Sequence, residues 1–68
     1  MKLISVQGKE KNVQSITKMN HTVDNTNGGE ERKYVKAIIV GNNGQSWTEY
    51  WELDSFLLLN EGRSFEWS

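Results

Sequence analysis

Apolar and polar residues alternate over short stretches of this chain, a pattern typical of β-strands that bury one side. We expect four strands from these stretches, at residues 2–6, 12–19, 33–40 and 45–53. In the second stretch, the spacing of Val13 and Ile16 also allows one helical turn, but the β-branched residues favour a strand. In the third, the consecutive residues Ile38, Ile39 and Val40 predict a central strand that is covered on both sides at that end.

The third and fourth strands should form a tight hairpin, because an Asn-Gly pair lies in the polar segment GNNGQ that joins them. A three-residue loop with a left-handed glycine pairs Ile39 with Trp47, whereas a four-residue loop pairs Ile38 with Trp47. Both registers put Trp47 and Trp51 on one face of the sheet and Tyr50 on the other, because side chains alternate along a strand.

Residues 20–32 contain one apolar side chain among Asn, Thr, Gly and charged residues, so we expect a long polar loop. Its oxygen-rich composition is that of a calcium loop, but the spacing does not fit. Counting Asp24 as the first ligand puts Gly28 at the fifth position and Val35 at the twelfth. His21, the only histidine, is expected to be a solvated loop residue, and we predict no metal site.

The pattern changes after the fourth strand. Asp54 suits the N-cap of a short helix, and Gly62 suits its end. The alternative is a strand at 56–60 that turns back as part of a second hairpin. A final strand should follow, with Phe65 and Trp67 on one face.

These elements predict a single domain, 1–68, that is mainly β. We expect a small antiparallel sheet or a five-stranded SH3-like barrel, with one short helix near the C-terminus. The element order resembles that of small SH3-like barrels, whose third and fourth strands form a tight hairpin and whose last strand follows one helical turn. The chain lacks the acidic, Tyr-rich first loop and the Trp-Trp pair with a later Pro of peptide-binding SH3 domains. The resemblance therefore does not imply recognition of proline-rich peptides.

Charge is distributed unevenly along the chain, although the net charge is only −1. Residues 1–36 hold seven Lys/Arg and four Asp/Glu, a charge of +3, whereas residues 37–68 hold one Arg and five acids, a charge of −4. The half that is rich in aromatic residues is thus the acidic half. Single-strand nucleic-acid binders show the reverse pairing, in which aromatics accompany Lys and Arg.

No arrangement of residues points to catalysis or to a cofactor. The serines lie outside any nucleophile-elbow motif, and the single histidine limits a catalytic triad. Glu49 and Glu52 are three residues apart in a strand, so their carboxyl groups should face opposite sides. There is also no cysteine to serve as a thiolate ligand or to form a disulfide. We expect a protein that is not an enzyme and binds no cofactor.

The aromatic residues of the fourth strand are the best candidates for function. A small core needs large side chains, which favours a core role for Trp47 and Trp51 and a surface position for Tyr50. An exposed aromatic residue with acidic neighbours suits a protein partner that has a basic surface. We predict a protein-binding module, for example a small inhibitor or adaptor encoded by a mobile element, that blocks its partner by covering it. The predicted partner-binding residues are Trp47, Glu49, Tyr50, Trp51, Glu52 and Trp67.

Two alternatives stay open at this point. Nucleic-acid binding would use Lys2, Lys9, Lys11, Lys18, Arg32 and Lys33, although the Lys-bearing strands contain no aromatic residue for base stacking. A small-molecule or nucleotide pocket could instead form between subunits, with the tryptophans as its walls. The first residues hold too few apolar positions for a signal peptide, and no apolar run approaches the roughly 20 residues that span a bilayer. We therefore expect a cytoplasmic protein without membrane association.

Overall fold

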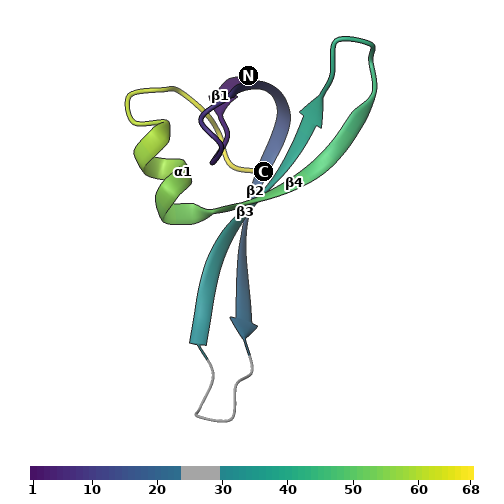
Figure 1. Ribbon diagram of the computed structural model, residues 1–68. Helices are drawn as coiled ribbons and strands as arrows, with labels where there is room; N and C mark the ends of the chain where they lie inside the picture. Colours follow the sequence, from purple (N-terminus) through teal and green to yellow (C-terminus); the bar gives the residue numbers. More distant parts are fainter. Residues whose placement is uncertain (24–29) are drawn as a thin grey trace.

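The computed structural model describes residues 1–23 and 30–68, except for the side chains of residues 21–23 and 30. Its elements are β1 (Lys2–Ile4), β2 (Glu10–Val23), β3 (Glu30–Val40), β4 (Ser46–Glu52) and α1 (Leu53–Leu59). The strands form an open antiparallel sheet in the order β1-β2-β3-β4, and α1 packs beside it (Figure 1). The prediction of a mainly β fold is confirmed in its small-sheet form, because the described residues form no fifth strand and no closed barrel.

β2 and β3 form a long hairpin whose far end projects beyond the rest of the fold (Figure 1). The prediction of a loop over 20–32 is wrong at both ends, because β2 continues to Val23 and β3 begins at Glu30. Among the described side chains of this ribbon, those of Asn20, Glu31, Arg32 and Lys33 are exposed, and the strands pair their backbone groups there. Residues 24–29 and the side chain of His21 lie outside the described residues, and with them most of the calcium-like segment.

The hairpin between β3 and β4 has the three-residue loop. Gly41 N–H donates to the carbonyl of Gln45 at 2.7 Å, and Gly44 adopts a left-handed φ of 82°. Ile39 therefore lies opposite Trp47, and the alternative four-residue register is wrong. A glycine is required at the left-handed position, because this backbone conformation is costly for other residues.

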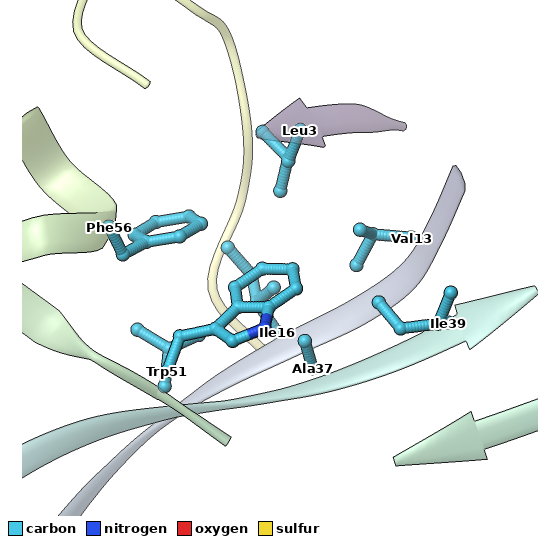
Figure 2. Close-up of a cluster of buried hydrophobic side chains, with 8 residues drawn as sticks. Leu3, Val13, Ile16, Ala37, Ile39, Trp51 and Phe56 are labelled. Atoms are coloured by element: carbon cyan, nitrogen blue, oxygen red, sulfur yellow. The ribbon is translucent and has the colours of Figure 1, made fainter. Parts of the chain in front are cut away.

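The hydrophobic core lies on one face of the sheet, under α1. Figure 2 shows Trp51 among aliphatic side chains of β2 and β3, with Phe56 of α1 beside it. The Trp51 and Phe56 rings stack with their centroids 5.7 Å apart. Ile38 and Val40 point to the opposite face and are only half-buried, so the prediction of full coverage on both sides is wrong. The buried hydrophobic residues are Leu3, Val13, Ile16, Val35, Ala37, Ile39, Trp51 and Phe56.

Helix α1 follows β4 directly, which confirms the predicted helix and excludes a strand at 56–60. Its N-cap is Glu52, which makes no side-chain capping bond, so the predicted N-cap at Asp54 is wrong. Asp54 lies in the first turn instead, where a carboxylate interacts favourably with the helix dipole. Gly62 follows the helix with a φ of 85°, in keeping with its predicted role at the helix end.

The last residues run along β2 without forming the predicted final strand. Ser68 N–H donates to the carbonyl of Ile16 at 2.7 Å. Phe65 and Trp67 nevertheless lie on one side as predicted, because both rings pack on Phe56, at centroid distances of 5.2 and 5.7 Å. The tail thus closes the aromatic end of the core with side chains rather than with a strand ladder.

Asn60 joins the two ends of the fold. Its buried amide accepts a hydrogen bond from Ile4 N–H at 2.6 Å and donates to the Ile4 carbonyl at 2.9 Å. Its Nδ2 also donates to the carbonyl of Phe56 at 2.9 Å, which accepts the backbone N–H of Asn60 as well, at 3.1 Å. Strand β1 is therefore held to the helix by side-chain hydrogen bonds as well as by apolar contact.

Candidate functional site

Strand β4 presents two different faces, because successive side chains point to opposite sides of the sheet. Trp51 points into the core and is 2% exposed, whereas its neighbour Tyr50 is 60% exposed on the face opposite α1. Trp47 and Glu49 lie on the side of Trp51, and Glu52 lies on the side of Tyr50. Both predicted arrangements are confirmed: the two tryptophans share a face, and the two glutamates do not.

The carboxylate of Glu49 binds both tryptophans of its face. Trp47 Nε1–H donates to one oxygen at 2.7 Å, and Trp51 Nε1–H donates to the other at 3.1 Å. Partial burial tends to raise the pKa of Glu49, but the two indole hydrogen bonds and the charge of Lys11 outweigh this, so the pKa is lowered. Since both oxygens accept hydrogen bonds from neutral indoles, Glu49 positions the two rings while it keeps its negative charge.

Trp47 lies at the border of the core and is 42% exposed. Its ring covers the backbone of Gly41, where an added Cβ would come within 2.9 Å of the indole. The ammonium group of Lys11 lies 5.9 Å from the ring centroid, within cation–π range. The predicted core role therefore holds for Trp51 but not for Trp47.

The open face, opposite α1, carries a shallow apolar hollow beside Tyr50. The hollow measures about 230 Å³ and is lined by Met19, Asn20, Tyr34 and Tyr50. Met19 lies opposite Tyr34, and Tyr34 lies opposite Glu52 at the end of β4. Tyr50 is on the same face, two residues before Glu52 and opposite Lys36. The exposed ring of Tyr50 therefore stands in an apolar surface that spans three strands and has a carboxylate at its border.

A wider charged hollow of about 590 Å³ adjoins this surface. Its lining combines the start of β3 with the end of β4 and the first turn of α1: Glu31, Arg32, Lys33, Tyr34, Glu52 and Asp54. Two of the cations predicted for nucleic-acid binding, Arg32 and Lys33, thus share a hollow with Glu52 and Asp54. Acidic groups this close weaken the attraction of such cations for phosphate.

No group of His, Asp and Glu that could hold a metal ion occurs among the residues that the structure describes. In the same part of the chain, no helix is long and apolar enough to cross a membrane. The chain matches no protein family, no curated protein and no solved structure. Its function has to be inferred from the geometry and charge of its own surface.

The six predicted partner-binding residues do not form one continuous surface. Tyr50 and Glu52 share the open face, whereas Trp47 and Glu49 lie on the core side and Trp51 is buried. The sixth, Trp67, is half-buried in the aromatic end of the core. Only the pair on the open face is available together for a single flat contact.

The cations of the alternative nucleic-acid site are also spread over several elements. Lys18 Nζ lies 4.8 Å from the centroid of the Trp67 ring, and Lys11 lies over Trp47 in the same manner. Lys2 and Lys9 are exposed on and after β1, at the other border of the sheet from β4. The Lys-bearing strands have no aromatic residue of their own for base stacking. Two of their lysines nevertheless contact aromatic rings, which come from distant parts of the chain.

The leucines of α1 form an exposed apolar surface that the sequence interpretation missed. Leu57, Leu58 and Leu59 are all exposed, and Leu58 reaches 73%. The signal was present in the sequence, because the four consecutive apolar residues FLLL cover a full helical turn and cannot all face the core. Only Phe56 of the four is buried.

Proposed function

We propose that this chain is a non-catalytic protein-binding module that uses the open face of β4. The observation that carries the proposal is Tyr50, a large aromatic side chain that stands 60% exposed beside the apolar hollow. Tyrosine is enriched at binding hot spots because it offers a large contact area together with a hydroxyl group. Met19 and Tyr34 extend the apolar area around it, so a partner would meet an aromatic centre with a polar border.

The acidic groups at the end of β4 and the start of α1 favour a basic partner, whereas Lys36 opposite Tyr50 and the cations Arg32 and Lys33 of the adjoining hollow lie on β3. Between Ala37 and Gly62 the chain holds four acids and no Lys or Arg. Glu52 lies on the face of Tyr50, and Asp54 follows in the adjoining hollow. Complementary charge of this kind speeds association and suppresses acidic competitors.

A finer version of the proposal is a small inhibitor or adaptor, of the kind that mobile elements encode, that acts in the cytoplasm by covering a partner's surface. A standard protein–protein interface uses about 800 Å² on each partner, which is roughly a sixth of the 4973 Å² surface of this protein. Surface occlusion needs no catalytic group.

The proposal is tested by affinity capture from the native host's lysate, with tagged protein at low and at high salt. Wild-type protein is compared with Tyr50→Ala and Glu52→Lys on the open face, and with Leu58→Ala on α1 as the matched control. We expect one protein in stoichiometric amounts at both salt concentrations. Loss of a hot-spot side chain should weaken its binding to Tyr50→Ala by roughly 30-fold or more.

Other outcomes of this capture contradict the proposal in different ways. A partner that binds both open-face variants as tightly as wild-type protein would exclude this face. A partner that is lost only with Leu58→Ala would move the contact to the leucine surface of α1. In either case the open face of β4 would not be the binding surface.

Nucleic-acid binding is the second candidate, and the pairs Lys11–Trp47 and Lys18–Trp67 favour it. Single-strand binders combine cations with aromatic rings in this way. It is tested by measuring the affinity for single-stranded DNA and RNA at several salt concentrations. The affinity should fall steeply as the salt concentration rises. If no binding is found at low salt, this candidate is rejected.

A pocket between subunits with the tryptophans as its walls has less support, because Trp51 is buried in the core.

A further inference from the structure

The outer edge of β4 has no strand beside it in the described part of the chain. The sheet order is β1-β2-β3-β4, so β4 has a neighbour on one side only. The hydrogen bond from Gly41 N–H to the Gln45 carbonyl fixes which residues of the hairpin bond to each other. In an antiparallel pair, bonded and non-bonded positions alternate, so Trp47, Glu49 and Trp51 direct their backbone groups to β3. The backbone groups of Ser46, Thr48 and Tyr50 point to the outer edge, and the strand ends at Glu52, the N-cap of α1.

This edge lacks three of the devices that usually protect exposed edge strands, namely proline, lysine and a bulge, and it keeps only the charges of Glu49 and Glu52. The segment from Ser46 to Glu52 contains no proline and no lysine. Its pairing with β3 runs without a bulge, in contrast to the register shift between Val13 and Ser15 on β2. Thr48 and Tyr50 are residue types that favour strands, and both are exposed. The edge is therefore a regular, accessible template for another strand.

Charge decides which strand fits this template. A second copy of the chain paired along β4 would bring the Glu49 and Glu52 side chains of both copies into one ribbon. β4 and α1 themselves hold no Lys or Arg to compensate for this concentration of like charge, and the nearby cations Lys11 and Lys36 belong to β2 and β3. An extended segment with basic side chains would instead put cations beside these carboxylates.

We infer that the outer edge of β4 accepts an extended, basic segment of the partner protein as an additional strand of the sheet. This inference rests on the proposed function and specifies its mode of recognition. Main-chain hydrogen bonds to the backbone groups of Ser46, Thr48 and Tyr50 hold the segment. Its side chains alternate between the open face, beside Tyr50, and the side of Trp47.

The first test uses a short, capped peptide of alternating lysine and valine, with the glutamate–valine counterpart as control. Amide hydrogen exchange and NMR spectra of the wild-type protein are recorded with each peptide. We expect the lysine peptide to slow exchange at the outward amides of Thr48 and Tyr50 by about tenfold or more, since a strand bonds these groups. The glutamate peptide should leave them unchanged. This measurement needs no variant and so does not depend on the folding of one.

The second test removes one outward donor. Thr48→Pro deletes an N–H that points away from β3, so the sheet ladder stays intact, as is usual for proline on an edge strand. Thr48→Val is the matched control, because it keeps the N–H and the shape of the side chain. We expect Thr48→Pro to weaken binding of the lysine peptide by about tenfold, while Thr48→Val binds as wild-type protein does.

Three results would overturn the strand-addition inference. The first is equal binding of Thr48→Pro and Thr48→Val, provided that both melt like wild-type protein. The second is no slowing of amide exchange at the β4 edge when the lysine peptide is present at about 1 mM. The third is slow exchange of the same amides in the absence of peptide, together with a dimer in light scattering. That result would show that a second copy of the chain occupies the edge.

The same variants separate this inference from the proposed function. A captured partner that is lost with Tyr50→Ala but retained with Thr48→Pro would keep the binding face and reject strand addition. A partner that is retained with both would reject both. Loss with both variants, together with protection of the β4 edge amides, supports the two proposals jointly.

Discussion

Tyr50 and Trp51 are neighbours in one strand, yet they have opposite environments. Trp51 is 2% exposed and contacts α1 and the sheet, while Tyr50 is 60% exposed on the open face. Composition alone would give both residues the same role, since each is a large aromatic side chain in a β-strand. The comparison teaches that strand alternation divides β4 into a face that holds the fold together and a face that is free to bind.

Among replacements on the core side, that of Trp51 should lower the free energy of unfolding the most. Trp51→Ala removes a buried indole and its hydrogen bond to Glu49, which should lower the free energy of unfolding by roughly 3–5 kcal/mol. A domain of this size has only a few kcal/mol of stability, so the variant should be largely unfolded at room temperature. Circular dichroism during urea unfolding measures the loss. Trp51→Phe serves as the control, and a loss below about 1 kcal/mol for Trp51→Ala would mean that the core does not depend on this side chain.

Replacement of Glu49, whose carboxylate accepts hydrogen bonds from both indoles, should lower the free energy of unfolding by a smaller amount. Because its pKa is lowered in the folded protein from the usual 4.5, its contribution is present above that value and is lost as the pH falls through the folded-state pKa. Glu49→Gln should cost about 1 kcal/mol or less near neutral pH and should flatten the loss of stability in acid. Urea unfolding from neutral to acid pH measures both effects. If the free energy of unfolding changes with pH in the same way for the variant and the wild-type protein, this role of Glu49 is contradicted.

The smallest effect on stability is expected at Tyr50, the residue with the largest expected effect on binding. Tyr50→Ala removes an exposed side chain and should change the free energy of unfolding by less than about 1 kcal/mol. Thermal unfolding of the same preparation that is used for capture provides the measurement. A loss as large as that of Trp51→Ala would show that the open face is also structural and would remove the contrast between the two faces.

Local pattern was sufficient to predict the two faces of β4 from the sequence. The alternation of Trp47, Tyr50 and Trp51 and the Asn-Gly turn depend on nearest neighbours along the chain, and both predictions are confirmed. The bond between Glu49 and the two indoles was also visible in principle. In the order Trp-Thr-Glu-Tyr-Trp, the glutamate shares a face with both tryptophans, because alternate residues lie on one side.

Other features depend on tertiary contacts that no local pattern specifies. The contact between Lys18 and Trp67 forms because the tail returns along β2, which the strand pattern did not predict. Residues 20–32 were expected to be a loop because polar residues are common in loops. Pairing between β2 and β3 overrides this preference as far as Val23 and Glu30, since backbone hydrogen bonds along the ladder do not depend on apolar side chains.

The amide of Asn60 also has a consequence for the kinetics of folding. It bonds to Ile4 across a sequence separation of 56 residues, and Ser68 bonds to Ile16 from even later in the chain. Contacts of such high contact order slow folding, because a long chain segment must be closed before they form. During synthesis, β1 can pair with β2 early, but the bonds between Ile4 and Asn60 can form only after the helix has been made.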